Sequence, residues 1–145
     1  FRLVAPFAAV NESVWEHLKL AFWPALLWAV FEHGPLHGRV NNFRIAKTAG
    51  IALMPLVIVV LFYAYTFVLG GHMLELDIAT FILAVGGGQY VSYRLMTGDE
   101  RSPYLNRIAP ALIVVLGVLF ILFTFLTPEV GLFRESATGV FGIPG

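Results

Sequence analysis

A short polar segment near the N-terminus carries the groups best suited to chemistry. Its residues are Asn11, Glu12, Ser13, Trp15, Glu16, His17 and Lys19, from the run Asn11-Glu-Ser-Val-Trp-Glu-His-Leu-Lys19. Carboxylate and imidazole ligands suit Zn, Mn or Fe, so Glu12, Glu16 and His17 are the candidate catalytic or metal-binding residues. The spacing argues against a metal, because the segment lacks both HExxH and the ExxH pair of di-iron bundles. Adjacent Glu16 and His17 would also diverge by about 100° on a helix.

The same residues have a structural interpretation, which we favour. Ser13 and Glu16 have the spacing of a capping box, in which the two side chains satisfy free amides of the first helical turn. Glu16 and Lys19 can pair at i, i+3. Capping does not explain His17, nor the depth of Lys19 within an apolar segment. Capping combined with a binding role therefore stays open.

The histidines offer further candidates. His17 and His72 are expected at the same side of the bundle, where they could approach each other as metal or haem ligands. A hydrogen-bonded structural histidine is the favoured interpretation of each. Between His33 and His37, Gly34 and Pro35 predict a turn that breaks the i, i+4 spacing of a metal pair. The sequence implies no particular cofactor.

A second polar and small-residue cluster lies on a later apolar segment. It consists of Gly86, Gly87, Gly88, Gln89 and Tyr90. Small residues allow close approach of a neighbouring helix in membranes, and we favour helix packing as the use of these glycines. The alternative is that they leave room for a ligand.

The composition of the chain indicates the kind of protein in which these residues lie. The chain has 145 residues, of which 59% are hydrophobic and 12% charged. Its mean hydropathy is +0.83. Nine basic and nine acidic residues cancel, so no field favours nucleic acid and we expect no nucleic-acid partner. The absence of cysteine excludes disulfides, thiolate metal sites and a cysteine nucleophile.

The apolar blocks predict an all-α, polytopic transmembrane helical bundle that forms a single domain over residues 1–145. The expected spans cover residues 12–33, 48–71, 74–94 and 107–127, followed by an irregular tail over 128–145. The charge-free part of the first span, Leu20–Phe31, has only 12 residues, so this helix must include the polar segment to cross the bilayer. The chain opens on Phe1 rather than Met, so we expect a segment upstream, which is either a signal peptide or a fifth helix.

The distribution of basic residues predicts orientation. The loops 34–47 and 95–107 and the helix ends beside them hold six basic residues, and the other side holds three. Lys and Arg favour the cytoplasmic side, so both loops are expected in the cytoplasm and the inner (plasma) membrane is the expected location. The segment Asn11–Lys19 and the C-terminus then lie outside. Glu32, near Asn42, Arg44 and Lys47, predicts an ion-pair cluster on the cytoplasmic side.

The polar segment also carries a family resemblance. Together with Phe22, Pro24 and the later Asn42-Phe43-x-x-Ala46-Lys47, it resembles an uncharacterised family of small bacterial polytopic membrane proteins with an NESxWEHLK signature. The resemblance implies this architecture, with a further helix upstream, and no activity. Trp15, His17 and Leu18 are also similar to the first motif of seven-helix zinc hydrolases of the progestin and adiponectin receptor type. No distal histidine pair follows them here.

Three functional classes are compatible with these features. We favour an accessory or structural subunit of a larger membrane complex, with the lipid bilayer and other membrane subunits as partners. The alternatives are a membrane-embedded metal-dependent hydrolase that uses Glu12, Glu16 and His17, and a small-solute or proton carrier gated by the same carboxylates. We lean against an enzyme, because each conspicuous residue has an adequate structural role.

Overall fold

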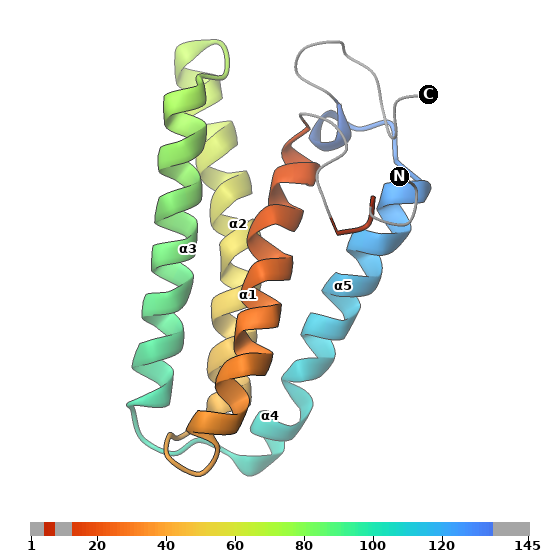
Figure 1. Ribbon diagram of the computed structural model, residues 1–145. Coiled ribbons are helices and arrows are strands. Elements are labelled where there is room, and N and C mark those ends of the chain that lie inside the picture. Colours follow the sequence, from red (N-terminus) through yellow and green to blue (C-terminus); the bar gives the residue numbers. More distant parts are fainter. Residues whose placement is uncertain (1–4, 8–12, 135–145) are drawn as a thin grey trace.

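The computed structural model describes residues 5–7 and 13–134, and these residues form a helical bundle (Figure 1). Its elements are α1 (Val14–Leu36), α2 (Phe43–Leu69), α3 (Leu74–Met96), α4 (Pro103–Ile108), α5 (Pro110–Phe125) and the short 3-10 helix η1 (Gly131–Phe133). Asn11, Glu12 and the tail beyond Arg134 lie outside the described residues.

Helix α2 is the central element. It packs against α1, α3 and α5, and α1 lies between α3 and α5 in the view of Figure 1. The α1–α2 and α3–α4 loops meet at one end of the bundle, which we call the basic end. The α2–α3 turn, η1 and the start of α1 lie at the other, which we call the motif end. The core between the helices includes Leu18, Phe22, Ile51, Met54 and Phe120.

Local signals set the helix ends. Ser13 caps α1, and Gly70 ends α2 in the left-handed region at φ 77°, where the lack of a Cβ removes the steric cost. Asn42 precedes α2 at φ 53°, a conformation that Asn tolerates better than most residues. Pro103 and Pro110 begin α4 and α5, where a missing amide hydrogen costs nothing.

Three boundaries differ from the sequence prediction. Helix α1 continues to Leu36 through Gly34 and Pro35, so the predicted turn between His33 and His37 is wrong. Their rings lie 5.4 Å apart between centroids. Helix α2 begins at Phe43 rather than residue 48, because its polar first turns are held by contacts at the basic end. The last predicted span begins earlier as well, with α4 at Pro103.

Two of the described helices are long and apolar enough to cross a membrane. They are Phe43–Leu69, with 27 residues, and the continuous stretch Pro103–Phe125, with 23 residues. The sequence predicts four spans. Helices α1 and α3 have comparable lengths, but their outer turns carry charges, Glu16, Lys19 and Glu32 on α1 and Glu75, Asp77 and Arg94 on α3, which shorten the charge-free stretch of each.

Candidate functional site

The helix cap predicted from sequence is present at the start of α1. The Glu16 backbone N–H donates to Ser13 Oγ, with 3.4 Å between the heavy atoms. Ser13 has extended backbone angles, as N-cap residues do, and it is buried. The cap fixes where α1 begins, and therefore the depth of every side chain that follows.

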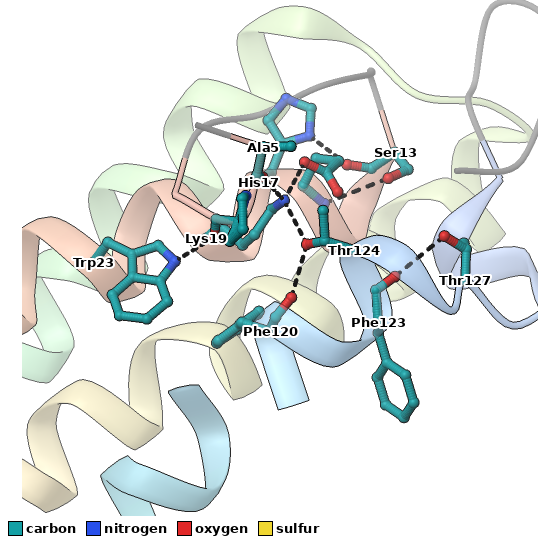
Figure 2. A network of polar contacts seen from close by, with 11 residues as sticks. Ala5, Ser13, His17, Lys19, Trp23, Phe120, Phe123, Thr124 and Thr127 are labelled. Carbon is teal, nitrogen blue, oxygen red and sulfur yellow. Dashed lines mark hydrogen bonds and ion pairs between the residues drawn. The ribbon is translucent and has the colours of Figure 1, made fainter. Parts of the chain in front are cut away.

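Lys19 occupies the centre of a polar network inside the protein (Figure 2). Its side chain has no solvent exposure, and its Nζ lies 2.6 Å from Glu16 Oε2 in an i, i+3 ion pair. Nζ also donates to Ala5 O at 2.8 Å and to Thr124 Oγ1 at 3.1 Å. These four residues, which we call the Lys19 network, tie the N-terminal segment and α5 to α1.

Thr124 extends the network along α5. Its hydroxyl donates to Phe120 O at 2.8 Å while accepting the bond from Lys19. An ammonium has three N–H donors, and Glu16, Ala5 and Thr124 provide an acceptor for each. A buried charge is tolerated when it is paired and its hydrogen-bonding capacity is filled, and both conditions hold for Lys19.

Tryptophan side chains of α1 surround this network. Trp15 packs on Phe120 and Phe133, with ring centroids 4.8 Å and 4.7 Å away. Trp23 Nε1 donates to Pro6 O at 2.8 Å, a second bond from α1 to the N-terminal segment. Phe133 is buried by its contact with Trp15, so part of the predicted irregular tail is a structured element.

His17 points away from the Lys19 network. Its Nδ1 donates to Ser13 O at 2.9 Å, and its exposed side chain contributes to a cavity of about 160 Å³ at the motif end. The cavity is also lined by His72 from the α2–α3 turn, by Asp77 and Thr80 from α3, and by apolar side chains of α2. The structure therefore brings His17 and His72 to the lining of one cavity. Whether they bind a ligand together stays a prediction.

Asp77 is the acidic group of that cavity. It accepts a hydrogen bond from the Tyr65 hydroxyl, and its Oδ2 lies 3.6 Å from His72 Nδ1. Across residues 5–7 and 13–134, no three side chains of His, Cys, Asp or Glu lie close enough to hold a metal ion together. Glu12, the third metal candidate of the polar segment, lies outside the described residues.

The glycine cluster of α3 divides into two kinds of position. A Cβ at Gly88 would lie 2.6 Å from Gly50 O and 2.7 Å from Met54 Cγ, so α3 and α2 touch through their backbones there. Gly86 and Gly87 face open space, with nothing within 4 Å of an added Cβ. Gln89 is half-buried and Tyr90 is exposed. Close helix packing therefore uses Gly88, with Gly50 as its partner on α2.

The basic end is held by a second set of polar contacts. Lys47 forms an ion pair with Glu32. Of the ion-pair cluster that the sequence predicted here, the described residues show this pair, and Arg44 takes no part in it. Asn42 is buried and joins the two loops: its amide donates to Leu95 O and Asp99 O, and its carbonyl accepts from Arg101 N. Asn106 Oδ1 accepts from the Ile45 N–H. These bonds fix α2 relative to the start of α4.

Several residues of these sites were not singled out from the sequence. For Thr124 the available signal is a lone hydroxyl in an apolar helix, which needs an acceptor or donor. Gly50 is the glycine of α2, and it could have been matched to the glycines of α3 as a site of close helix packing. Ala5 O and Pro6 O act through backbone carbonyls, for which side-chain identity gives no signal.

Comparison with known proteins adds a family and no activity. No curated protein and no solved structure matches the chain. One family model does match, over residues 2–143, which is nearly the whole length of the chain. The chain therefore belongs to the family of unknown function DUF6512.

Proposed function

We propose that this protein is a four-span integral membrane protein that acts as an accessory or structural subunit of a larger membrane complex. The observation that carries the proposal is the internal pairing of its buried charges, Lys19 with buried Glu16 and Lys47 with half-buried Glu32. A charge near the bilayer centre costs about 2.5–3.5 kcal/mol on insertion scales, and pairing inside the bundle relieves this cost. These four charged residues therefore have a structural role in the bundle.

The outer surface supports placement in a bilayer. Large hydrophobic side chains are exposed on every long helix, in a pattern that water would disfavour and lipid would not. Examples are Phe31 on α1, Phe67 on α2, Ile82 on α3 and Val114 on α5, with exposed fractions of 72%, 90%, 64% and 64%. A surface of this kind also suits contact with other membrane subunits.

The orientation we propose follows from the two ends. Arg39, Arg44, Lys47, Arg94, Arg101 and Arg107 all belong to the basic end, where hydrogen bonds join the two loops. We assign this end to the cytoplasm and the motif end to the outside, in agreement with the bias of basic residues toward the cytoplasmic side.

Thiol labelling in intact cells tests this orientation. The chain has no cysteine, so Met73→Cys in the α2–α3 turn and Tyr104→Cys at the basic end each introduce a single reactive group. Both positions are exposed in the structure. We expect an impermeant reagent to label the first variant in intact cells and the second only after permeabilisation. The reverse pattern would overturn the orientation, and labelling of both in intact cells would overturn membrane placement.

Native mass spectrometry of protein gently extracted from its own membrane, with elemental analysis of the same sample, tests the subunit role. We expect a larger complex of fixed stoichiometry and no stoichiometric metal. A lone chain that carries one equivalent of zinc or iron would overturn the proposal in favour of the hydrolase. Pairing of Glu16 with Lys19 weighs against that alternative, since it occupies the carboxylate that a metal would need.

The cavity at the motif end favours the carrier as second candidate. His17, His72 and Asp77 line a space of about 160 Å³, which is large enough for small polar solutes or a few waters. A carrier role predicts that His72→Ala abolishes proton flux into proteoliposomes, while His37→Ala at the basic end leaves it unchanged. Equal flux in both variants would remove this candidate.

A further inference from the structure

A second and larger cavity opens between α1, α2 and α5 in the half of the bundle toward the basic end. Its volume is about 550 Å³, within the usual range of small-molecule sites. Along most of its length the walls are apolar, with Leu26 and Val30 from α1, Ile51 from α2, and Val114 and Val118 from α5. We call this cavity the α1–α5 groove.

The polar residues of the groove are all found at one end. They are His33 near the end of α1 and Arg44, Lys47 and Thr48 in the first turns of α2. Among the residues that the structure describes, no acidic side chain lines the groove. Lys47 is neutralised by Glu32, but Arg44 is exposed and forms no ion pair within the described part of the chain. The mouth therefore carries an uncompensated positive charge.

The dimensions suit one leaflet of a bilayer. On α5 the lining residues extend from Pro110 to Ile121, which at 1.5 Å per residue is about 17 Å. Half of the hydrocarbon core is about 15 Å. On α1, Trp23 is the lining residue farthest from the basic end, and its ring lies 3.6 Å from the position of a Cβ at Gly117. The groove thus ends near mid-bundle, between Trp23 and α5.

We infer that the α1–α5 groove binds an anionic phospholipid of the cytoplasmic leaflet, with its phosphate at Arg44 and His33 and one acyl chain along α5. Basic pockets between helices at the cytoplasmic side recognise anionic head groups, and a chain in the groove would cover exposed Val30 and Val114. The positive charge at the mouth complements an anionic lipid head group. A transmembrane helix of a partner would bring only apolar side chains to the groove and would leave this charge unpaired. The inference rests on the proposed membrane location.

Native mass spectrometry of purified protein with added phosphatidylglycerol or phosphatidylcholine tests this site. We expect wild-type protein to retain one phosphatidylglycerol in preference to phosphatidylcholine. Arg44→Gln should weaken phosphatidylglycerol binding about five-fold, as expected for one basic residue at a membrane surface. Arg39→Gln, an exposed arginine of the same end that does not line the groove, should leave binding unchanged.

A matched pair on α5 tests the acyl chain. Val118→Trp fills the groove, and Val115→Trp places the same ring on α5 outside it. Both valines are more than half exposed, so both variants should fold, which circular dichroism will verify. We expect only Val118→Trp to lose the bound lipid.

Four outcomes would overturn the inference. Equal binding of both lipids, with no effect of Arg44→Gln, would exclude recognition of the head group. Competition by inorganic phosphate with no requirement for a chain would assign the mouth to free phosphate. Loss of a partner protein, but of no lipid, from Val118→Trp would assign the groove to a helix. If the protein passes the thiol-labelling test but binds no phosphatidylglycerol, this inference is wrong and the proposed membrane location still holds.

Discussion

Helices α2 and α3 meet in a different way from helices α1 and α5. At Gly50 and Gly88 the backbones of α2 and α3 touch, and a Cβ on either residue would lie 2.5–2.6 Å from the carbonyl oxygen of the other. Helices α1 and α5 meet through large rings and one ammonium, with Phe22 and Phe120 centroids 4.9 Å apart and Lys19 bonded to Thr124. The α2–α3 contact depends on the absence of side chains at two glycines. The α1–α5 contact depends on aromatic rings and on a hydrogen bond between side chains. Toward the basic end neither device joins α1 to α5, and the α1–α5 groove lies there.

The largest effect should come from breaking the polar contact of α1 with α5. Lys19→Ala leaves the Glu16 carboxylate, which is 4% exposed, without its ammonium partner. Removing one member of a buried pair costs about 3–5 kcal/mol, so we expect the free energy of unfolding in detergent micelles to fall by about that amount. Arg39→Ala, which removes an exposed cation, is the control.

A double variant sharpens this test. In Glu16→Gln/Lys19→Met no unpaired charge is left in the core, so the loss of unfolding free energy should be smaller than for Lys19→Ala alone. If Lys19→Ala and Arg39→Ala lower the free energy of unfolding equally, the Lys19 network does not stabilise the fold.

The next effect concerns the backbone contact of α2 with α3. Gly88→Ala forces a methyl group against Gly50 O and Met54, and overpacking of this kind costs about 1–3 kcal/mol. Gly86→Ala, two residues earlier on the same helix, faces open space and should stabilise α3 by up to about 1 kcal/mol through helix propensity. Thermal unfolding of both variants in one detergent measures the difference. Equal effects would mean that the two helices separate easily at Gly88.

The smallest effect isolates one hydrogen bond. Thr124 and Thr127 both donate to the carbonyl four residues earlier, but only Thr124 accepts from Lys19. Thr124→Val should therefore lower the unfolding free energy more than Thr127→Val does. The expected difference is about 0.6 kcal/mol and at most about 1.7 kcal/mol, the mean and the maximum for side-chain hydrogen bonds measured inside a membrane protein. A difference of zero would show that Glu16 and Ala5 alone hold the ammonium.

Local features of the fold were predictable where local signals decide them. The order of the helices, the cap at Ser13 and the Glu16–Lys19 pair all follow from residues close in sequence or from helical periodicity. The Glu32–Lys47 pair joins α1 to α2 across 15 residues, and the sequence predicted it only as part of a polar cluster at that loop. The helix through Gly34 and Pro35 was missed because Pro breaks a helix interior, whereas Pro35 lies in the last turn of α1, which ends one residue later at Leu36.

The long-range features were not predictable from single residues. Three consecutive glycines predict a packing surface, but only the position of α2 decides that Gly88 is in contact and that Gly86 is not. Asn42 joins loops more than 50 residues apart, and nothing in its neighbours gives the register of that contact. Lys19 was expected to need partners, yet two of its three acceptors come from Ala5 and from Thr124, which no local pattern links to it.

The Lys19 network also has a consequence for the order of synthesis. Lys19 and Thr124 are 105 residues apart in the chain, and ribosomes add about 5–20 residues per second, so roughly 5–20 s pass before Thr124 exists. During that interval α1 must already hold its ammonium in an apolar setting. Glu16 is three residues from Lys19 and is made before it, so this acidic residue can neutralise the charge on the nascent chain from the moment the first turns of α1 form. The i, i+3 pair can therefore lower the cost of burying Lys19 before the bundle is complete. Thr124 later accepts a hydrogen bond from an ammonium that Glu16 has already neutralised.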